Sequence, residues 1–279
     1  MQPAEPSRTA FGAALLRAAH QLVDRPPVFA DPLALKIVGR DAAAQLRESI
    51  NDPAVAQSSP LRAFIAARSR FAEDSFAQSH AHGVTQYVLL GAGLDTFAYR
   101  HTHDGVTVFE VDHPATQAWK RQQLGKTEIA IPSSVVFAPV DFERESLREG
   151  LGRTGFDFAK PAFFTWLGVT PYLSRDSIAS TLSFAASLPK ESEIVFEYVE
   201  PRNSHDAAQN QFMAELSSRV AAAGEPFKSF FTPEEMAALL HGFSQIEDLD
   251  AAALNARYFA GRADGLGLRG RAHMVRAKV

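Results

Sequence analysis

The segment Tyr87–Thr96, with the sequence YVLLGAGLDT, constrains the fold more than any other part of this chain. An apolar run leads into two glycines separated by one residue, which predicts a buried parallel strand and then a tight turn at the start of a helix. Glycine suits such a turn because it tolerates positive φ and lets a ligand approach the backbone closely. In open α/β sheets, ligands bind at these carboxyl ends of strands. The segment therefore predicts an α/β fold with a nucleotide-type site at this turn.

The remainder of the chain supports an α/β fold. Five short apolar runs from residue 86 onward alternate with segments that can be helical, which predicts βαβ units and a mostly parallel sheet. Two further strands are expected near the C-terminus, the final one an edge strand because its polar and apolar residues alternate. No strand is expected before residue 86, so residues 1–85 should form a helical N-terminal cap on a core of residues 86–279, in one integrated domain. The predicted strands are Tyr87–Leu90, Val106–Val111, Val135–Val140, Ala162–Leu167, Ile194–Val199, Ser244–Leu249 and Ala272–Val279.

Composition excludes several classes of function. The 28 basic and 32 acidic residues leave a net charge of −4, which gives no case for binding to nucleic acid or to an anionic membrane. The chain has no cysteine, which excludes disulfides, thiolate metal sites and a cysteine nucleophile. The apolar stretch at residues 11–23 is interrupted by Arg17 and His20, so neither a signal peptide nor a membrane span is expected. These features predict a cytoplasmic protein.

Asp112 is the second element of the predicted site. It ends the second predicted strand and follows Gly91 by 21 residues (112 − 91 = 21). That separation is expected for an acid at the tip of the neighbouring strand, where a carboxylate can accept both hydrogen bonds of a ribose diol. A solvated acid at a strand end is the plainer alternative. Glu110, two residues earlier, is the fallback candidate for the ribose.

The turn itself discriminates between nucleoside ligands. A dinucleotide site favours a third glycine where this chain has Thr96. Asp95 also places an anion close to where a pyrophosphate would lie, which is electrostatically unfavourable. An acid at this position suits a ligand that bears an ammonium and a sulfonium group, as S-adenosyl-L-methionine does. An NAD-dependent oxidoreductase remains the alternative.

The third predicted strand ends at Val140 and is followed by Asp141 and Phe142. An acid next to an apolar residue at a strand tip suits adenine, since the carboxylate can accept from the exocyclic amine and the apolar side chain can pack on the ring. Asp141 could equally cap a helix that begins near Arg144. Both interpretations are open on the pattern alone.

Two motifs, Gly91–Arg100 (GAGLDTFAYR) and Phe109–Pro114 (FEVDHP), resemble the leucine carboxyl methyltransferase family. Within that family, the chain is most similar to a bacterial branch of S-adenosylmethionine-dependent methyltransferases. The resemblance covers most of the chain, from about residue 8 into the final strands. Softer similarity is found at Leu16–His20, Asp31–Ala34, Ala67–Phe71 and Trp166–Leu173.

The resemblance implies a Rossmann-like, seven-stranded class I methyltransferase sheet with its last strand antiparallel, a helical cap and S-adenosyl-L-methionine as cofactor. It also implies that Arg68 binds the methionine carboxylate, whose geometry its guanidinium matches, and that Arg17 assists from the cap. The chain departs from the family at Leu167, where family members often have a glutamate that touches the cofactor. The implied cofactor residues are Arg17, Arg68, Gly91, Gly93, Asp95, Asp112, Asp141 and Phe142.

The expected reaction is O-methylation, by in-line displacement, of a carboxylate or hydroxyl on a small molecule or a peptide C-terminus. A carboxylate acceptor needs no general base, whereas a hydroxyl does. Tyr172, Tyr198 and Arg202 are the candidates facing the acceptor, with Arg202 suited to an acidic one. The pairs His80/His82 and His101/His103 predict no metal site, because no acid cluster accompanies them. The substitution at 167 keeps a non-catalytic nucleoside-binding protein open as a further alternative.

Overall fold

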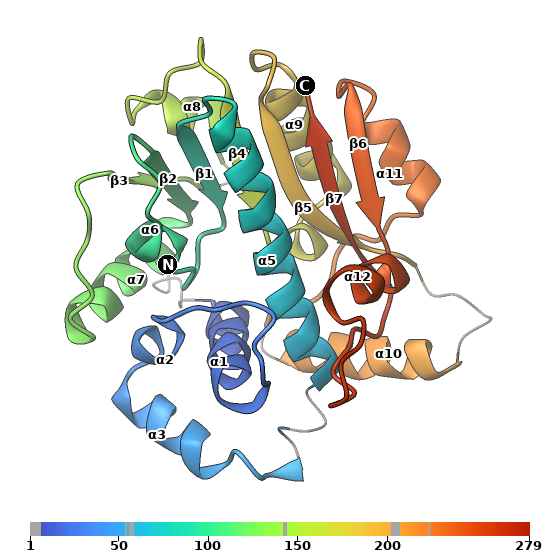
Figure 1. Cartoon of the computed structure of the whole chain (residues 1–279). Coiled ribbons are helices and arrows are strands. Elements are labelled where there is room, and N and C mark those ends of the chain that lie inside the picture. The colour runs from blue at the N-terminus through green and yellow to red at the C-terminus, as the bar shows by residue number, and fades with distance from the viewer. Residues whose placement is uncertain (1–6, 54, 56–58, 142–143, 202–206, 223) are drawn as a thin grey trace.

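The computed structural model describes residues 7–279 except residues 54, 56–58, 142–143, 202–206 and 223, and its centre is a seven-stranded sheet (Figure 1). In chain order the strands are β1 Gln86–Leu90, β2 Thr107–Asp112, β3 Val135–Pro139, β4 Ala162–Trp166, β5 Glu193–Val199, β6 Gln245–Leu249 and β7 Ala272–Lys278. Their spatial order is β3-β2-β1-β4-β5-β7-β6. Strands β1 to β5 are parallel, and β7 is antiparallel to both neighbours. The predicted fold, with its antiparallel last strand, is confirmed.

The place of the last strand in the sheet corrects one expectation. The alternating sequence predicts an edge strand at residues 272–279, but β7 lies between β5 and β6, and β6 forms the edge. The polar residues of β7 are paired with acids rather than solvated: Arg276 binds Glu193 of β5 at 2.6 Å, and His273 lies 2.7 Å from Asp248 of β6. The alternation of polar and apolar residues along β7 therefore arises from ion pairs with its two neighbouring strands, and not from exposure of one face at the edge of the sheet.

Helices cover both faces of the sheet, as the alternation of side chains along the strands requires. Tyr87 and Leu89 pack in one apolar cluster with residues of α5 and α12, whereas Val88 and Leu90 pack in a second with residues of α8, α9 and α11. Figure 1 shows the long α5 crossing the first of these faces. None of the helices within the described ranges has the length and apolar character to cross a bilayer. The helices are α1 Arg8–Val23, α2 Ala34–Ile37, α3 Arg40–Glu48, α5 Ser59–Ala81, α6 Phe97–Arg100, α7 Pro114–Lys126, α8 Leu147–Gly152, α9 Arg175–Ala186, α10 Ala207–Ala222, α11 Pro233–Leu239 and α12 Ala251–Tyr258, with a 3₁₀ turn η1 at Thr170–Tyr172.

The first three helices lie at the end of the sheet where β1 finishes (Figure 1). Ala14 and Ala18 of α1 and Ile37 of α2 form an apolar cluster with Leu94, which belongs to the glycine-containing turn, and with Leu124 of α7. The α1 helix begins after Ser7, whose side chain accepts a hydrogen bond from Ala10 N. The N-terminal helices are therefore packed directly against the predicted ligand-binding turn.

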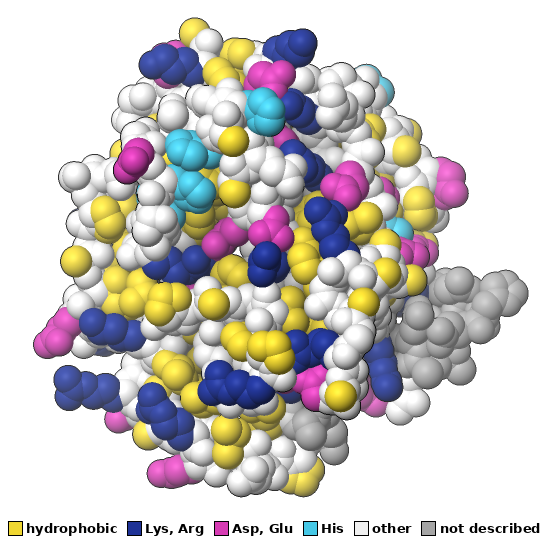
Figure 2. Space-filling model, viewed as in Figure 1, with side chains coloured by type: hydrophobic (Ala, Val, Ile, Leu, Met, Phe, Trp, Pro, Cys, Tyr) yellow, Lys and Arg dark blue, Asp and Glu magenta, His cyan; other side chains and the backbone are white. Residues whose placement is uncertain are grey.

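Acidic and basic side chains lie among one another on the face shown in Figure 2, with Lys and Arg more frequent in its lower part. The chain as a whole has a net charge of −4.

Candidate functional site

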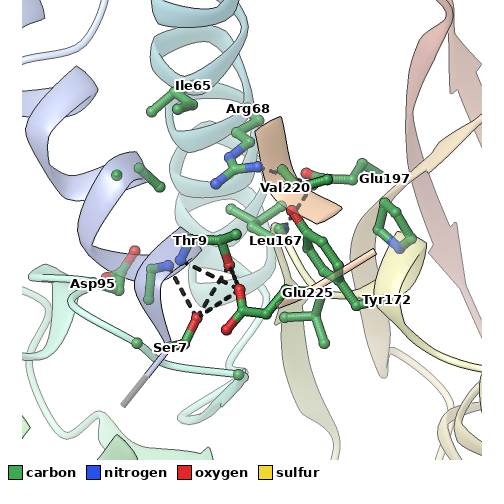
Figure 3. A pocket seen from close by; sticks show the side chains of 18 of the residues that line it. Ser7, Thr9, Ile65, Arg68, Asp95, Leu167, Tyr172, Glu197, Val220 and Glu225 are labelled. Carbon is green, nitrogen blue, oxygen red and sulfur yellow. Dashed lines mark hydrogen bonds and ion pairs between the residues drawn. The ribbon is translucent and has the colours of Figure 1, made fainter. Parts of the chain in front are cut away.

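A cavity of about 760 Å³ lies at the carboxyl ends of the central strands, beside helices α1 and α5 (Figure 3). Its volume falls within the range of small-molecule sites. The chain runs outward from β1 to β2 and β3 on one side and from β4 to β5 on the other, so the cavity lies at the point where the strand order reverses. The "turn end" of the cavity comprises Gly91–Asp95, Asp112 and Asp141, and its "far end" comprises Arg68, Glu197, Tyr172, Glu225, Phe227, Lys228 and residues 269–272.

The turn after β1 depends on its glycines. Gly91 has φ of +67° and Gly93 has φ of +42°, in the region that side chains rarely adopt. A Cβ atom at Gly91 would lie only 2.3 Å from Cγ2 of Val169. The N–H groups of Gly91 and Ala92 both donate to the carbonyl oxygen of Val111, at 2.8 and 3.1 Å. The turn is thus held against the tip of β2, with its backbone on the cavity wall.

Asp112 connects the tips of β1 and β2. Its Oδ2 accepts from Gly93 N at 2.6 Å and its Oδ1 accepts from His113 N at 2.7 Å. Burial raises the pKa of Asp112, and these two N–H donors oppose the shift. The fallback candidate, Glu110, points elsewhere, because its carboxylate is fully buried and accepts from Lys120 Nζ at 2.7 Å and Tyr99 Oη at 2.9 Å. Asp112, unlike Glu110, lines the cavity.

Asp95 and Asp141 complete the acidic groups of the turn end. Asp95 Oδ1 accepts from Phe97 N at 2.7 Å, at the start of the short helix α6. Asp141 Oδ2 lies 3.4 Å from Nε of Arg144. The N-cap of α8 is Ser146, with a capping box to Glu149, so Asp141 does not cap that helix. Phe142, expected to pack on the same ligand, lies outside the described residues.

Arg17 lines the cavity but is bound to other protein groups. Its Nε donates to Asp31 Oδ2 at 2.7 Å and its Nη2 donates to the carbonyl oxygen of Leu94 at 2.6 Å. Asp31 also accepts from Thr96 Oγ1 at 2.7 Å. These bonds hold α1 onto the glycine-containing turn, so Arg17 positions the turn from the cap.

Arg68 extends from α5 into the far end of the cavity (Figure 3). Its Nη1 donates to Oε1 of Glu197, a residue of β5, at 2.9 Å, and Gly168 N donates to the same oxygen at 2.7 Å. Glu197 was not among the predicted site residues, because its neighbour Tyr198 was chosen from the strand Ile194–Val199 as the residue that faces the acceptor. An acid in the middle of that apolar run was the available signal.

Tyr172 and Tyr198, both predicted to face an acceptor, occupy different surroundings. Tyr172 lines the cavity, and burial is the main cause that raises its pKa to about 12. Tyr198 does not reach the cavity; its hydroxyl donates to Asp248 at 2.7 Å and its ring stacks on His273 with centroids 4.7 Å apart. Tyr198 is adjacent to Glu197 on β5, so the two side chains point to opposite faces of the sheet. Arg202 lies outside the described residues.

The rest of the far end combines apolar and cationic side chains contributed by distant parts of the sequence. A hydrogen-bonded group joins the start of α1 to the segment after α10: Glu225 Oε2 accepts from Ser7 Oγ at 3.2 Å, from Thr9 N at 3.3 Å and from Thr9 Oγ1 (Figure 3). This contact closes one side of the cavity. The apolar lining includes Leu61, Phe64, Leu173, Met213, Leu216, Val220 and Phe227, and the cationic lining includes Lys228, Arg269 and Arg271.

Comparison with known proteins connects this arrangement to one family. The family model for leucine carboxyl methyltransferase matches residues 10–186, which include the glycine-containing turn, Asp112 and Asp141. The chain belongs to the leucine carboxyl methyltransferase family. YktD of Bacillus subtilis, a candidate S-adenosyl-L-methionine-dependent methyltransferase, is 33% identical over 305 aligned positions that cover 99% of each protein. Rv3787c of Mycobacterium tuberculosis, described in the same terms, is 30% identical over 73% of this chain and 68% of its own length.

Solved structures agree on the fold. A candidate methyltransferase from Thermobifida fusca superimposes with a TM-score of 0.57 at 15% identity, over 98% of this chain and 95% of that one. A protein from Streptomyces avermitilis gives a TM-score of 0.52 at 15% identity, over 87% and 94%. This member of the leucine carboxyl methyltransferase family is accordingly an S-adenosylmethionine-dependent methyltransferase with the class I fold. That assignment replaces the oxidoreductase and the non-catalytic protein that the sequence motifs had left open.

Within the described part of the chain, no three histidine or acidic side chains cluster in a way that could hold a metal ion. His80 and His103 instead pack in an aromatic group around Phe76, with ring centroids 5.0 to 5.7 Å apart. Burial lowers the pKa of His103. These half-buried histidines therefore pack against the aromatic side chains at the C-terminal end of α5.

Proposed function

We propose that this methyltransferase is an O-methyltransferase that esterifies the carboxylate of an apolar acid, either a small molecule or a peptide C-terminus. The observation that carries the proposal is the composition of the far end, where an apolar wall that includes Phe64 and Phe227 meets the cationic residues Lys228, Arg269 and Arg271. An apolar wall favours a hydrophobic acceptor, and cations favour one that carries a negative charge.

The protonation states around the cavity also favour a carboxylate. An acceptor carboxylate is ionised near neutral pH and needs no general base, whereas a hydroxyl would need one. Tyr172, with its pKa raised to about 12, is protonated at neutral pH. Glu197 and Glu225 accept hydrogen bonds from Arg68 and Thr9, and His113 Nδ1 accepts from Ala115 N. Tyr172 is thus protonated, and Glu197, Glu225 and His113 each accept at least one hydrogen bond from the protein.

The turn end suits the nucleoside part of S-adenosyl-L-methionine, and the roles of its residues are part of this proposal. Gly91 and Gly93 would let the cofactor lie against the backbone, Asp112 would accept from the ribose hydroxyls, and Asp141 would accept from adenine. Arg68 would bind the methionine carboxylate as a guanidinium–carboxylate pair.

When bound, the cofactor supplies a methyl group activated by attachment to a sulfonium. The chain's own residues must then align the acceptor oxygen with the methyl–sulfur bond and exclude water. Tyr172, which lines the far end, would orient the acceptor through its hydroxyl. The contact between Glu225 and the start of α1 would keep water from one side of the cavity.

Two measurements test this function. Isothermal titration with S-adenosylhomocysteine should give saturable binding, and no heat of binding at millimolar ligand would contradict the cofactor assignment. A transfer assay with tritiated methyl donor should then compare apolar carboxylic acids, peptides with a free C-terminal carboxylate, and phenols. Label released as methanol by alkali identifies a carboxyl ester, because aryl ethers resist alkali. Stable label on phenols with none on carboxylates would contradict the carboxylate acceptor.

A further inference from the structure

Glu197 is a buried acid of which only one oxygen is satisfied. Its exposed fraction is 3%, and it lies at the cavity next to Arg68 (Figure 3). Oε1 accepts from Arg68 and from Gly168 N, but Oε2 has no hydrogen-bond partner among the residues that the structure describes. Burial raises the pKa of Glu197, and Arg68 opposes that shift. Leaving a buried carboxylate oxygen unpaired destabilises a fold, so a partner from outside the chain would remove that cost.

We propose that Glu197 binds the α-ammonium group of the cofactor's methionine end, with Arg68 beside it binding the α-carboxylate. An amino acid end carries one positive and one negative group on the same carbon, and Arg68 and Glu197 present the two opposite charges 2.9 Å apart. Oε2 supplies the free acceptor that an ammonium group needs. The inference rests on the proposed cofactor site and adds to it the acid that recognises the amino group.

The backbone around Gly168 is shaped for this pair. Gly168 has φ of +77°, and its N–H donates to Glu197. A Cβ atom at this position would lie 2.9 Å from Nη2 of Arg68. Glycine therefore permits both the turn that bonds Glu197 and the close approach of the guanidinium.

The strand register explains how an acid reaches this place in the absence of one at residue 167. Trp166 of β4 pairs with Phe196 of β5, so the next positions along these parallel strands are Leu167 and Glu197. Both residues line the cavity. Glu197 thus presents its carboxylate beside Leu167, from the position that faces it on the adjacent strand.

The test compares two ligands that differ at the amino acid end. S-adenosylhomocysteine has that end, and 5′-methylthioadenosine has the same nucleoside and thioether without it. Calorimetry on Glu197→Gln should show affinity for S-adenosylhomocysteine reduced by at least about tenfold, as expected for a lost charge-assisted bond, with affinity for methylthioadenosine unchanged. Glu193→Gln is the matched control, since Glu193 is a buried acid of the same strand that is paired with Arg276 and does not line the cavity. It should change neither affinity.

A positional rescue sharpens the test. Adding Leu167→Glu to Glu197→Gln should restore much of the affinity for S-adenosylhomocysteine, because it returns a carboxylate to the same part of the cavity. If Glu197→Gln fails to fold, Glu197→Asp keeps the charge for Arg68 but withdraws it from the ligand, and the same difference between the ligands is expected. Equal losses for both ligands, or no loss, would overturn the inference. A wild-type protein that binds neither ligand would instead overturn the proposed cofactor site.

Discussion

The turn end of the cavity is built from residues that are close together in the sequence, whereas the far end is assembled from distant ones. Gly91, Gly93 and Asp112 belong to two adjacent strand tips: Gly91 N donates to the carbonyl oxygen of Val111, and Gly93 N donates to the carboxylate of Asp112. At the far end, Arg68 meets Glu197 although 129 residues separate them. The comparison suggests that the turn end is set by local backbone geometry, which tolerates little change, and that the far end is set by side chains, which can be exchanged for one another.

The largest expected effect is at the turn end, from Gly91→Ala. The new Cβ combines a left-handed backbone with a 2.3 Å contact to Val169, which should cost about 2–4 kcal/mol of folding free energy. Binding of S-adenosylhomocysteine should fall below detection. Gly105→Ala is the control, because Gly105 has a similar φ of +70° with nothing within 4 Å of its Cβ position. Chemical denaturation and calorimetry check both variants; equal effects would mean that the close approach of Val169 is unimportant.

Asp112→Ala should weaken both S-adenosylhomocysteine and methylthioadenosine by roughly 1–3 kcal/mol, because it removes a charged acceptor that serves the shared nucleoside. This result would contrast with the ligand-selective loss expected at Glu197. Calorimetry with the two ligands measures the difference. A loss of affinity for S-adenosylhomocysteine alone would show that Asp112 acts at the amino acid end, and would contradict the assignment of the nucleoside to the turn end.

His273, which follows the last residues of the far end along the chain, provides a pH-dependent test. Burial alone would lower its pKa, but Asp248 and Glu200, which lie 2.7 and 2.6 Å away, raise it above 6.5. The folded state therefore binds this proton more tightly than the unfolded state, so the stabilisation is complete below about pH 6.5 and is lost as the pH rises through the folded pKa.

Accordingly, His273→Gln should lose about 1–2 kcal/mol of unfolding free energy near pH 5.5, and less at alkaline pH. Urea denaturation of both proteins at several pH values checks the sign. A loss that grows with pH would contradict it. Because His273 follows the cavity-lining segment 269–272, acceptor binding should weaken with rising pH more than nucleoside binding does.

The smallest effect is expected at Arg269, an exposed cation on the cavity lining. Arg269→Gln should raise the KM for a carboxylate acceptor severalfold, since exposed charges contribute little when solvent screens them. Affinity for S-adenosylhomocysteine should not change. Steady-state kinetics at low and high salt would detect the difference, and an unaltered KM at low salt would remove Arg269 from the acceptor site.

The same contrast explains what could be predicted from the sequence. The strands, the glycine-containing turn and Asp112 were predictable because each depends on periodicity or spacing within a short segment. The capping box from Thr232 to Glu235 at the start of α11 is equally local, and the structure contains it. Most of the turn end could therefore be predicted from short motifs and their spacing in the sequence.

The far end required tertiary information. Tyr198 and Glu197 are adjacent in sequence, and only the orientation of β5 decides which one reaches the cavity. The position of β7 between β5 and β6 was likewise hidden, because the acids that pair with His273 and Arg276 lie on other strands. Side chains that meet across strands leave no spacing signal along the chain.

A crystal structure with bound S-adenosylhomocysteine tests the account most directly. We expect the ribose to contact Asp112 at the turn end. The amino acid end should lie between Arg68 and Glu197, with its ammonium group bound to Oε2 of Glu197. A ligand bound in the reverse direction, or with its ammonium away from Glu197, would contradict it.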